Sequence, residues 1–112
     1  MDEVDEQSFK NLFYQYYPEL FSFAYSLLGD RTSARRGTTG VFLLLWKKRG
    51  HFNNEKDTRA FLYSTIRNNC LNYLKFKQKN PDVKEYFPEM ERDDTFPADV
   101  WQELSDFVAS IS

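Results

Sequence analysis

Four polar residues share one side of a helical stretch, at spacings of four and three: Asn68, Asn72, Lys75 and Lys79. Amides can hydrogen-bond base edges and lysines can neutralise phosphates, so such a side is suited to contact nucleic acid. No acid follows Asp57 in this stretch, although a merely solvated side would be expected to mix lysine with glutamate. A solvated surface that happens to be basic remains the alternative.

The same stretch carries an apolar stripe on its opposite side. The stripe consists of Leu62, Ile66, Cys70 and Tyr73. Spacings of four, four and three are typical of a helix that packs on a core. The pattern therefore predicts a helix over residues 57–79, with Asp57 or Thr58 as its cap. The pair Asn80-Pro81 is predicted to end it.

Helical spacing also predicts other helices, over residues 9–28, 30–49 and 98–111. Ser8 is the predicted cap of the first and Gly29 its C-cap, while Pro18 either kinks it or begins a new segment. No stretch alternates with period two, so the predicted fold class is all-α, a compact bundle of three or four helices. Its predicted core contains Leu12, Tyr16, Leu27, Val41, Leu45, Leu62, Ile66 and Tyr73.

The helix predicted over residues 30–49 is apolar on two sides. Val41 lies on one side, and Thr39, Leu43 and Trp46 lie on the other. Such a helix is either buried all round or docks on a partner. Full burial is hard to arrange in so small a protein, so the outer side is predicted to be exposed for a partner.

Charge is strongly segregated along the chain. Residues 31–80 hold twelve Lys and Arg against two acids, a balance of +10. Residues 1–30 have a balance of −5 and residues 81–112 a balance of −7, so the formal net charge is only −2. A basic middle between acidic ends can bind a polyanion in spite of that net charge.

Composition argues against several other kinds of site. The single cysteine, Cys70, forbids an internal disulfide, favours a reducing compartment and is predicted to be a small buried hydrophobe. One histidine, His51, does not make a zinc site with it, and no cofactor is expected. The acidic N-terminus is unlike a signal peptide and the apolar run 41–46 is too short to span a membrane, so a cytoplasmic protein is predicted.

Three groups of residues carry a family resemblance. They are Tyr16-Tyr17-Pro18, the apolar run 41–46 that ends in Trp46, and a helix containing Arg59-Ala60-Phe61-Leu62-Tyr63, Arg67-Asn68 and Cys70-Leu71-Asn72-Tyr73-Leu74-Lys75. Across residues 9–79 the pattern resembles the second conserved region of bacterial RNA polymerase sigma factors of the extracytoplasmic-function group. The family usually has Asp at the position of Asn72 and often Arg at that of Lys75.

The resemblance implies a transcription initiation module that binds the clamp helices of core RNA polymerase and recognises and melts the promoter minus-ten element. It assigns contacts with the non-template strand to Phe61, Arg67, Asn68, Asn72, Lys75 and Lys79. It assigns capture of an extruded base to the loop of His51, Phe52, Asn53 and Asn54, for which a plain polar connector is the alternative. It assigns polymerase contacts to Arg35, Arg36, Thr39, Leu43, Trp46 and Lys47. An anti-sigma factor would be a further partner.

Two features depart from the family pattern. Where the family usually has an acidic, amide-containing run, residues 35–40 read Arg-Arg-Gly-Thr-Thr-Gly, and such a charge reversal would oppose normal polymerase docking. The two glycines also predict a frayed or irregular helix start. The chain ends at Ser112 without the second helical domain that reads the minus-thirty-five element, so a fragment or a shortened relative is expected.

Two functions therefore remain open. The polar stripe over residues 68–79 favours an initiation module, whereas the run 35–40 favours a sigma-like interaction protein that has lost normal polymerase docking. No Ser-His-Asp set, metal-ligand spacing or Gly-rich phosphate loop appears, so an enzyme is not expected. The predicted division is an acidic tail over residues 1–8, a sigma-like helical domain over 9–80, and an acidic linker with a short last helix over 81–112.

Overall fold

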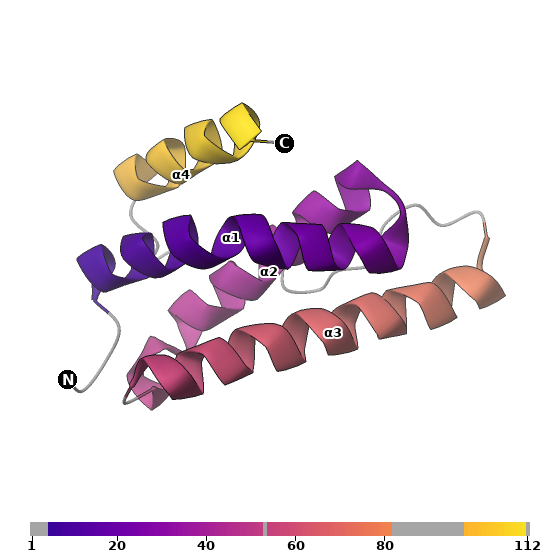
Figure 1. Ribbon diagram of the computed structural model, residues 1–112, viewed down its shortest axis with the longest axis horizontal. Helices are drawn as coiled ribbons and strands as arrows, with labels where there is room; N and C mark the ends of the chain where they lie inside the picture. The colour runs from indigo at the N-terminus through magenta and orange to yellow at the C-terminus, as the bar shows by residue number, and fades with distance from the viewer. Residues whose placement is uncertain (1–4, 53, 82–97, 112) are drawn as a thin grey trace.

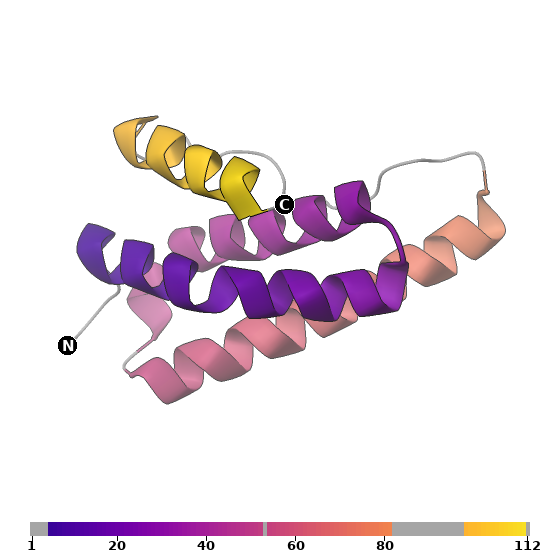
Figure 2. The same cartoon turned by 45° about the horizontal axis from the view of Figure 1, so that its top comes forward.

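Four α-helices and one short 3-10 helix account for nearly all of the residues that the computed structural model describes, which are 5–52, 54–81 and 98–111. Their order is α1 (Glu6–Leu28), α2 (Arg31–Lys47), η1 (Arg49–His51), α3 (Glu55–Lys79) and α4 (Ala98–Ile111). The three long helices pack against one another in every pair, and α4 packs against α1 (Figures 1 and 2). The described ranges contain no strand, and the all-α prediction is confirmed.

Helix α1 begins at Glu6, earlier than predicted. Asp5 is its cap, because the side chain of Asp5 accepts a hydrogen bond from the backbone N–H of Ser8 at 2.7 Å. The prediction that Ser8 caps the helix was therefore wrong: Ser8 supplies the N–H that a cap satisfies. The helix continues through Pro18 and ends at Gly29, whose φ of 71° is the left-handed conformation predicted for this C-cap.

Helix α2 has a regular start, which corrects the predicted fraying. The carboxylate of Asp30 accepts hydrogen bonds from the Ser33 hydroxyl at 2.6 Å and from the Ser33 N–H at 3.0 Å, and these bonds lower the pKa of Asp30. Gly37 and Gly40 are buried inside the helix. Capping and burial thus offset the roughly 1 kcal/mol that each glycine costs relative to alanine.

Helix α3 begins at Glu55, because Asn54 is its cap in place of the predicted Asp57 or Thr58. The Asn54 side-chain oxygen accepts a hydrogen bond from the Asp57 N–H at 2.9 Å. The helix ends before Asn80, as predicted. Its apolar stripe is buried along its whole length, at Leu62, Ile66, Cys70 and Tyr73.

The core is rich in aromatic rings from α1 and α2. Phe13 lies 4.7 Å from Phe42 and 5.0 Å from Tyr17 between ring centroids, and Phe9 lies 5.3 Å from Trp46. Such ring pairs add to the stabilisation that burial alone provides. Of the eight core residues predicted, six are buried and two, Leu12 and Leu27, are partly buried.

The outer side of α2 is buried, contrary to prediction. Thr39, Leu43 and Trp46 expose only 9%, 2% and 6% of their surface. The physical reason lies in other helices: the Phe9 ring of α1 meets Trp46 edge-on, and α4 lies beside Thr39. Among the helices that the structure describes, none is long and apolar enough to cross a membrane.

Candidate nucleic-acid interface

Helix α3 is positioned by contacts that leave one of its sides to solvent. The Tyr63 hydroxyl donates a hydrogen bond to Glu19 of α1 at 2.6 Å, and the Tyr16 hydroxyl of α1 donates one to Glu55 at 3.5 Å. Burial and the bond to Glu19 raise the pKa of Tyr63 to about 12, so Tyr63 remains a donor at neutral pH. With its apolar stripe buried, α3 presents the opposite side outward.

That outward side carries the four residues predicted to contact DNA, Asn68, Asn72, Lys75 and Lys79. All four are exposed, and none of their side chains forms a hydrogen bond or an ion pair with another residue in the described ranges. At a rise of about 1.5 Å per residue, the stripe is roughly 16 Å long. At about 3.4 Å per nucleotide, this length matches roughly five stacked nucleotides. The structure thus brings these four side chains together as one available surface.

The electrostatic character of α3 is uniform beyond its first turn. After Asp57 the helix contains no acid, and the cations in this part of it are Arg59, Arg67, Lys75, Lys77 and Lys79. Arg67 is exposed beside Asn68. The guanidinium of Arg59 lies over the Tyr63 ring at 5.0 Å. A positive helix side of this kind attracts phosphate whatever the base sequence.

The loop before α3 contacts α3 through two aromatic rings, that of Phe52 in the loop and that of Phe61 in the helix. Phe61 is partly buried, and its ring lies 4.9 Å from that of Phe52. His51 is exposed at the end of η1. The amide of Asn54 is already bonded to Asp57, through both its oxygen and its nitrogen. Of the predicted base-capture residues, Asn53 lies outside the described residues.

A groove of about 200 Å³ lies between this loop and α1. It is lined by Ser8, Asn11, Leu12, Gln15, Phe52, Asn54, Glu55 and Thr58. The amides of Asn11 and Gln15 were missed by the sequence predictions. Their spacing of four on α1 was the signal, but nothing in the sequence places that side of α1 beside a loop some forty residues later.

The all-α fold agrees with a comparison of the chain with protein families. The family model for sigma-70 region 2 matches residues 12–80. The chain belongs to the sigma-70 region 2 family. Its members act in transcription initiation, with core RNA polymerase and promoter DNA as partners. Searches of the curated proteins and of the solved structures gave no match.

The sigma-70 region 2 match covers all four residues of the α3 stripe and all of α2, and α4 lies beyond it. Along α2, the predicted polymerase contacts differ in their burial. Arg35 and Lys47 are exposed and Arg36 is partly buried, whereas Thr39, Leu43 and Trp46 are buried. The structure therefore does not present these six residues as one open surface.

The Trp46 ring of the sigma-70 region 2 domain is contacted by a cation and by a second aromatic ring. The guanidinium of Arg49 lies over it at 4.1 Å, and Arg49 also donates a hydrogen bond to the Trp46 carbonyl at 2.7 Å. The Phe9 ring meets it edge-on. Trp46 thus stabilises the junction of α1, α2 and η1. From the sequence alone, its position in an apolar run was equally compatible with binding to a partner.

Proposed function

We propose that the chain is the promoter-recognising module of an extracytoplasmic-function sigma factor, which binds core RNA polymerase and melts the minus-ten element. The observation that carries the proposal is the exposed stripe of two amides and two lysines on α3, in a chain of the sigma-70 region 2 family. We assign residues 9–80 to this module and residues 81–112 to an acidic linker that includes α4. The protein acts in the cytoplasm, with an anti-sigma factor as a further partner.

In this proposal the stripe holds the non-template strand. Lys75 and Lys79 neutralise phosphates and so set the affinity, whereas Asn68 and Asn72 hydrogen-bond the edges of unstacked bases and so set the preference. A base that leaves the stack enters the groove beside the loop, where the Phe52 ring offers a stacking surface. The buried opposite side of α3 keeps the four side chains in a fixed line.

The test is the binding of matched and scrambled non-template oligonucleotides to the complex of the chain with core RNA polymerase. Asn72→Ala should lower the discrimination between the two by about 1–3 kcal/mol, because the amide reads a base edge. Gln78→Ala is the matched control: it removes an exposed amide that lies about 120° round α3 from Asn72. Equal discrimination by wild type and Asn72→Ala would show that the stripe does not read bases.

A second candidate function is a sigma-like module that binds another protein and has lost normal polymerase docking. The burial of Thr39, Leu43 and Trp46 favours it, because three of the six predicted polymerase contacts are covered. The arginines at positions 35 and 36 favour it as well, since the family usually carries acids in this run. A chain of this kind would not be retained by immobilised core RNA polymerase, whereas the initiation module would be.

A further inference from the structure

Helix α4 packs against α1 and borders a groove together with α2. Val100, Leu104 and Val108 follow one another at spacings of four and are all buried. The other sides of α4 carry Asp99, Glu103 and Asp106 and no basic residue. The helix therefore docks through one apolar stripe, and its charge is purely acidic.

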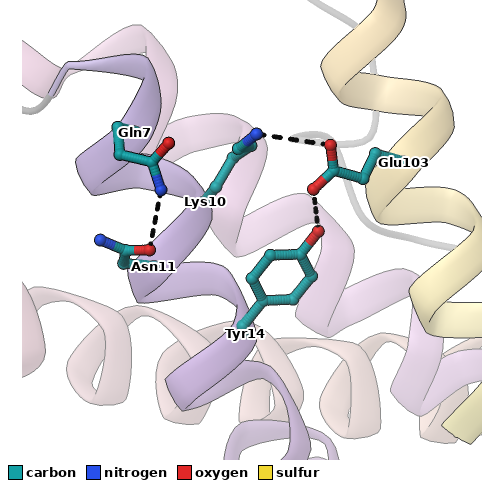
Figure 3. Close-up of polar contacts among 5 residues, drawn as sticks. All are labelled: Gln7, Lys10, Asn11, Tyr14 and Glu103. Carbon is teal, nitrogen blue, oxygen red and sulfur yellow. Dashed lines mark hydrogen bonds and ion pairs between the residues drawn. The ribbon is translucent and has the colours of Figure 1, made fainter.

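On α1, the contact is both polar and aromatic. The carboxylate of Glu103 accepts a hydrogen bond from the Tyr14 hydroxyl and lies 3.4 Å from the Lys10 ammonium (Figure 3). The Phe107 ring meets the Tyr14 ring edge-on at 4.8 Å and the Phe13 ring at 6.2 Å. These contacts specify how α4 lies on α1, because each needs a particular partner in place.

A groove of about 420 Å³ lies between α2 and α4. From α2 the lining residues are Thr32, Arg35, Arg36 and Thr39. From α4 they include Trp101, Leu104 and Val108. Three of the four α2 residues are predicted polymerase contacts, so α4 stands on the side of α2 that a polymerase helix would need. Figures 1 and 2 show α1 and α2 between α4 and α3, so the DNA stripe is not what α4 covers.

The part of α2 that departs from the family pattern, residues 35–40, contributes to the groove beside α4. Arginines stand at positions 35 and 36, where the family usually has an acidic run, and the helix beside them is acidic and lacks basic residues. The α4 residues that line this groove are Trp101, Leu104, Ser105, Val108 and Ala109, and none of them is charged. The two arginines of α2 therefore share the groove with an uncharged, largely apolar side of α4.

We propose that α4 and core RNA polymerase compete for the same surface, the side of α2 and the adjoining part of α1 that α4 covers. The inference rests on the proposed function. While α4 is docked on α1, the chain cannot bind core RNA polymerase. Polymerase binds after α4 has left, through a helix that takes its place against Phe13 and Thr39. A partner that binds only the open form has its apparent affinity reduced by the open fraction.

The first experiment releases α4 by Leu104→Asp, which places a charge in the buried stripe of the full chain. Amide hydrogen exchange over residues 98–111 should become fast, and the affinity for core RNA polymerase should rise by about tenfold or more. Ala98→Asp is the matched control: it adds the same charge at an exposed position in the first turn, where an acid is tolerated. That control should leave both measurements at wild-type values.

The second experiment locks α4 in place and does not depend on a destabilising change. A cleavable thiol cross-linker joins the cysteines of Lys10→Cys and Glu103→Cys, whose native side chains already meet. Cys70 does not compete for the reagent, since it is buried and burial raises the pKa of its thiol to about 11. The locked chain should lose polymerase binding, and cleavage of the linker should restore it. Lys10→Cys alone, treated with the reagent, controls for the bulk of the linker.

The outcomes separate this inference from the function on which it rests. If locked and cleaved chains bind polymerase equally well, α4 does not compete and the inference is wrong, while the initiation function stands. If neither the cleaved chain nor Leu104→Asp binds polymerase, the proposed function fails and the inference falls with it. Should Leu104→Asp unfold the whole domain, the comparison of locked and cleaved chains decides.

Discussion

Replacing both Lys75 and Lys79 by alanine tests whether the α3 stripe binds phosphates. Both side chains are exposed and lack an ion pair with any residue that the structure describes, so the free energy of unfolding should change by less than about 0.5 kcal/mol for each. For a single strand, each neutralised phosphate contributes about 0.7 to the slope of log affinity against log salt. Loss of two contacts should therefore flatten the slope by about 1.4.

That change in slope corresponds to a measurable difference in affinity. Between about 50 and about 200 mM salt, wild type should lose roughly sevenfold more affinity than the double variant. The assay is fluorescence anisotropy with a labelled single-stranded oligonucleotide at four or five salt concentrations. At the lowest salt concentration the double variant should bind all sequences more weakly, because phosphate contacts carry no sequence information.

The matched control is the double variant Lys56→Ala/Lys77→Ala, which removes the same charge from the same helix. These lysines lie about 100° or more round α3 from the two stripe lysines, and Lys77 lies over the Tyr73 ring at 5.8 Å. The control should keep most of the wild-type slope. Equal slopes in the two double variants would refute the reasoning, because affinity would then follow net charge and not the stripe.

Three further predictions concern stability, pH and reactivity. Ile66→Ala should lower the free energy of unfolding by about 2–5 kcal/mol in urea denaturation, because Ile66 is fully buried; a loss below 1 kcal/mol would contradict that burial. The bond to Glu103, burial and the Glu103 charge raise the pKa of Tyr14 from 10.0 to about 12, so the contribution of Tyr14 to α4 docking should be complete below about pH 10 and lost towards pH 12. Fluorescence of Trp101 in a Trp46→Phe background should report this alkaline transition, and Tyr14→Phe should lack that part of it. Cys70 should react with a thiol reagent only after unfolding, and rapid labelling of the native chain would show that α3 opens.

Local signals predicted much of the fold correctly. The two stripes of α3, the Gly29 C-cap and the extent of α4 all depend on residues within a few positions of one another, so periodicity and capping chemistry are enough. Helix starts were less predictable where several polar residues stand in a row. Asn54, Asp57 and Thr58 can all cap in principle, and the backbone conformation of the loop selects Asn54.

The sequence by itself determined that α3 has an apolar and a polar basic side, and that α2 is apolar on two sides. Only the tertiary structure decided what covers the second side of α2. Periodicity reports which side of a helix avoids water, whereas burial depends on elements brought from elsewhere, here Phe9 of α1 and the helix α4. The bond between Tyr14 and Glu103 joins residues 89 positions apart. No local pattern encodes such a contact, since it exists only once α1, α2 and α4 have packed.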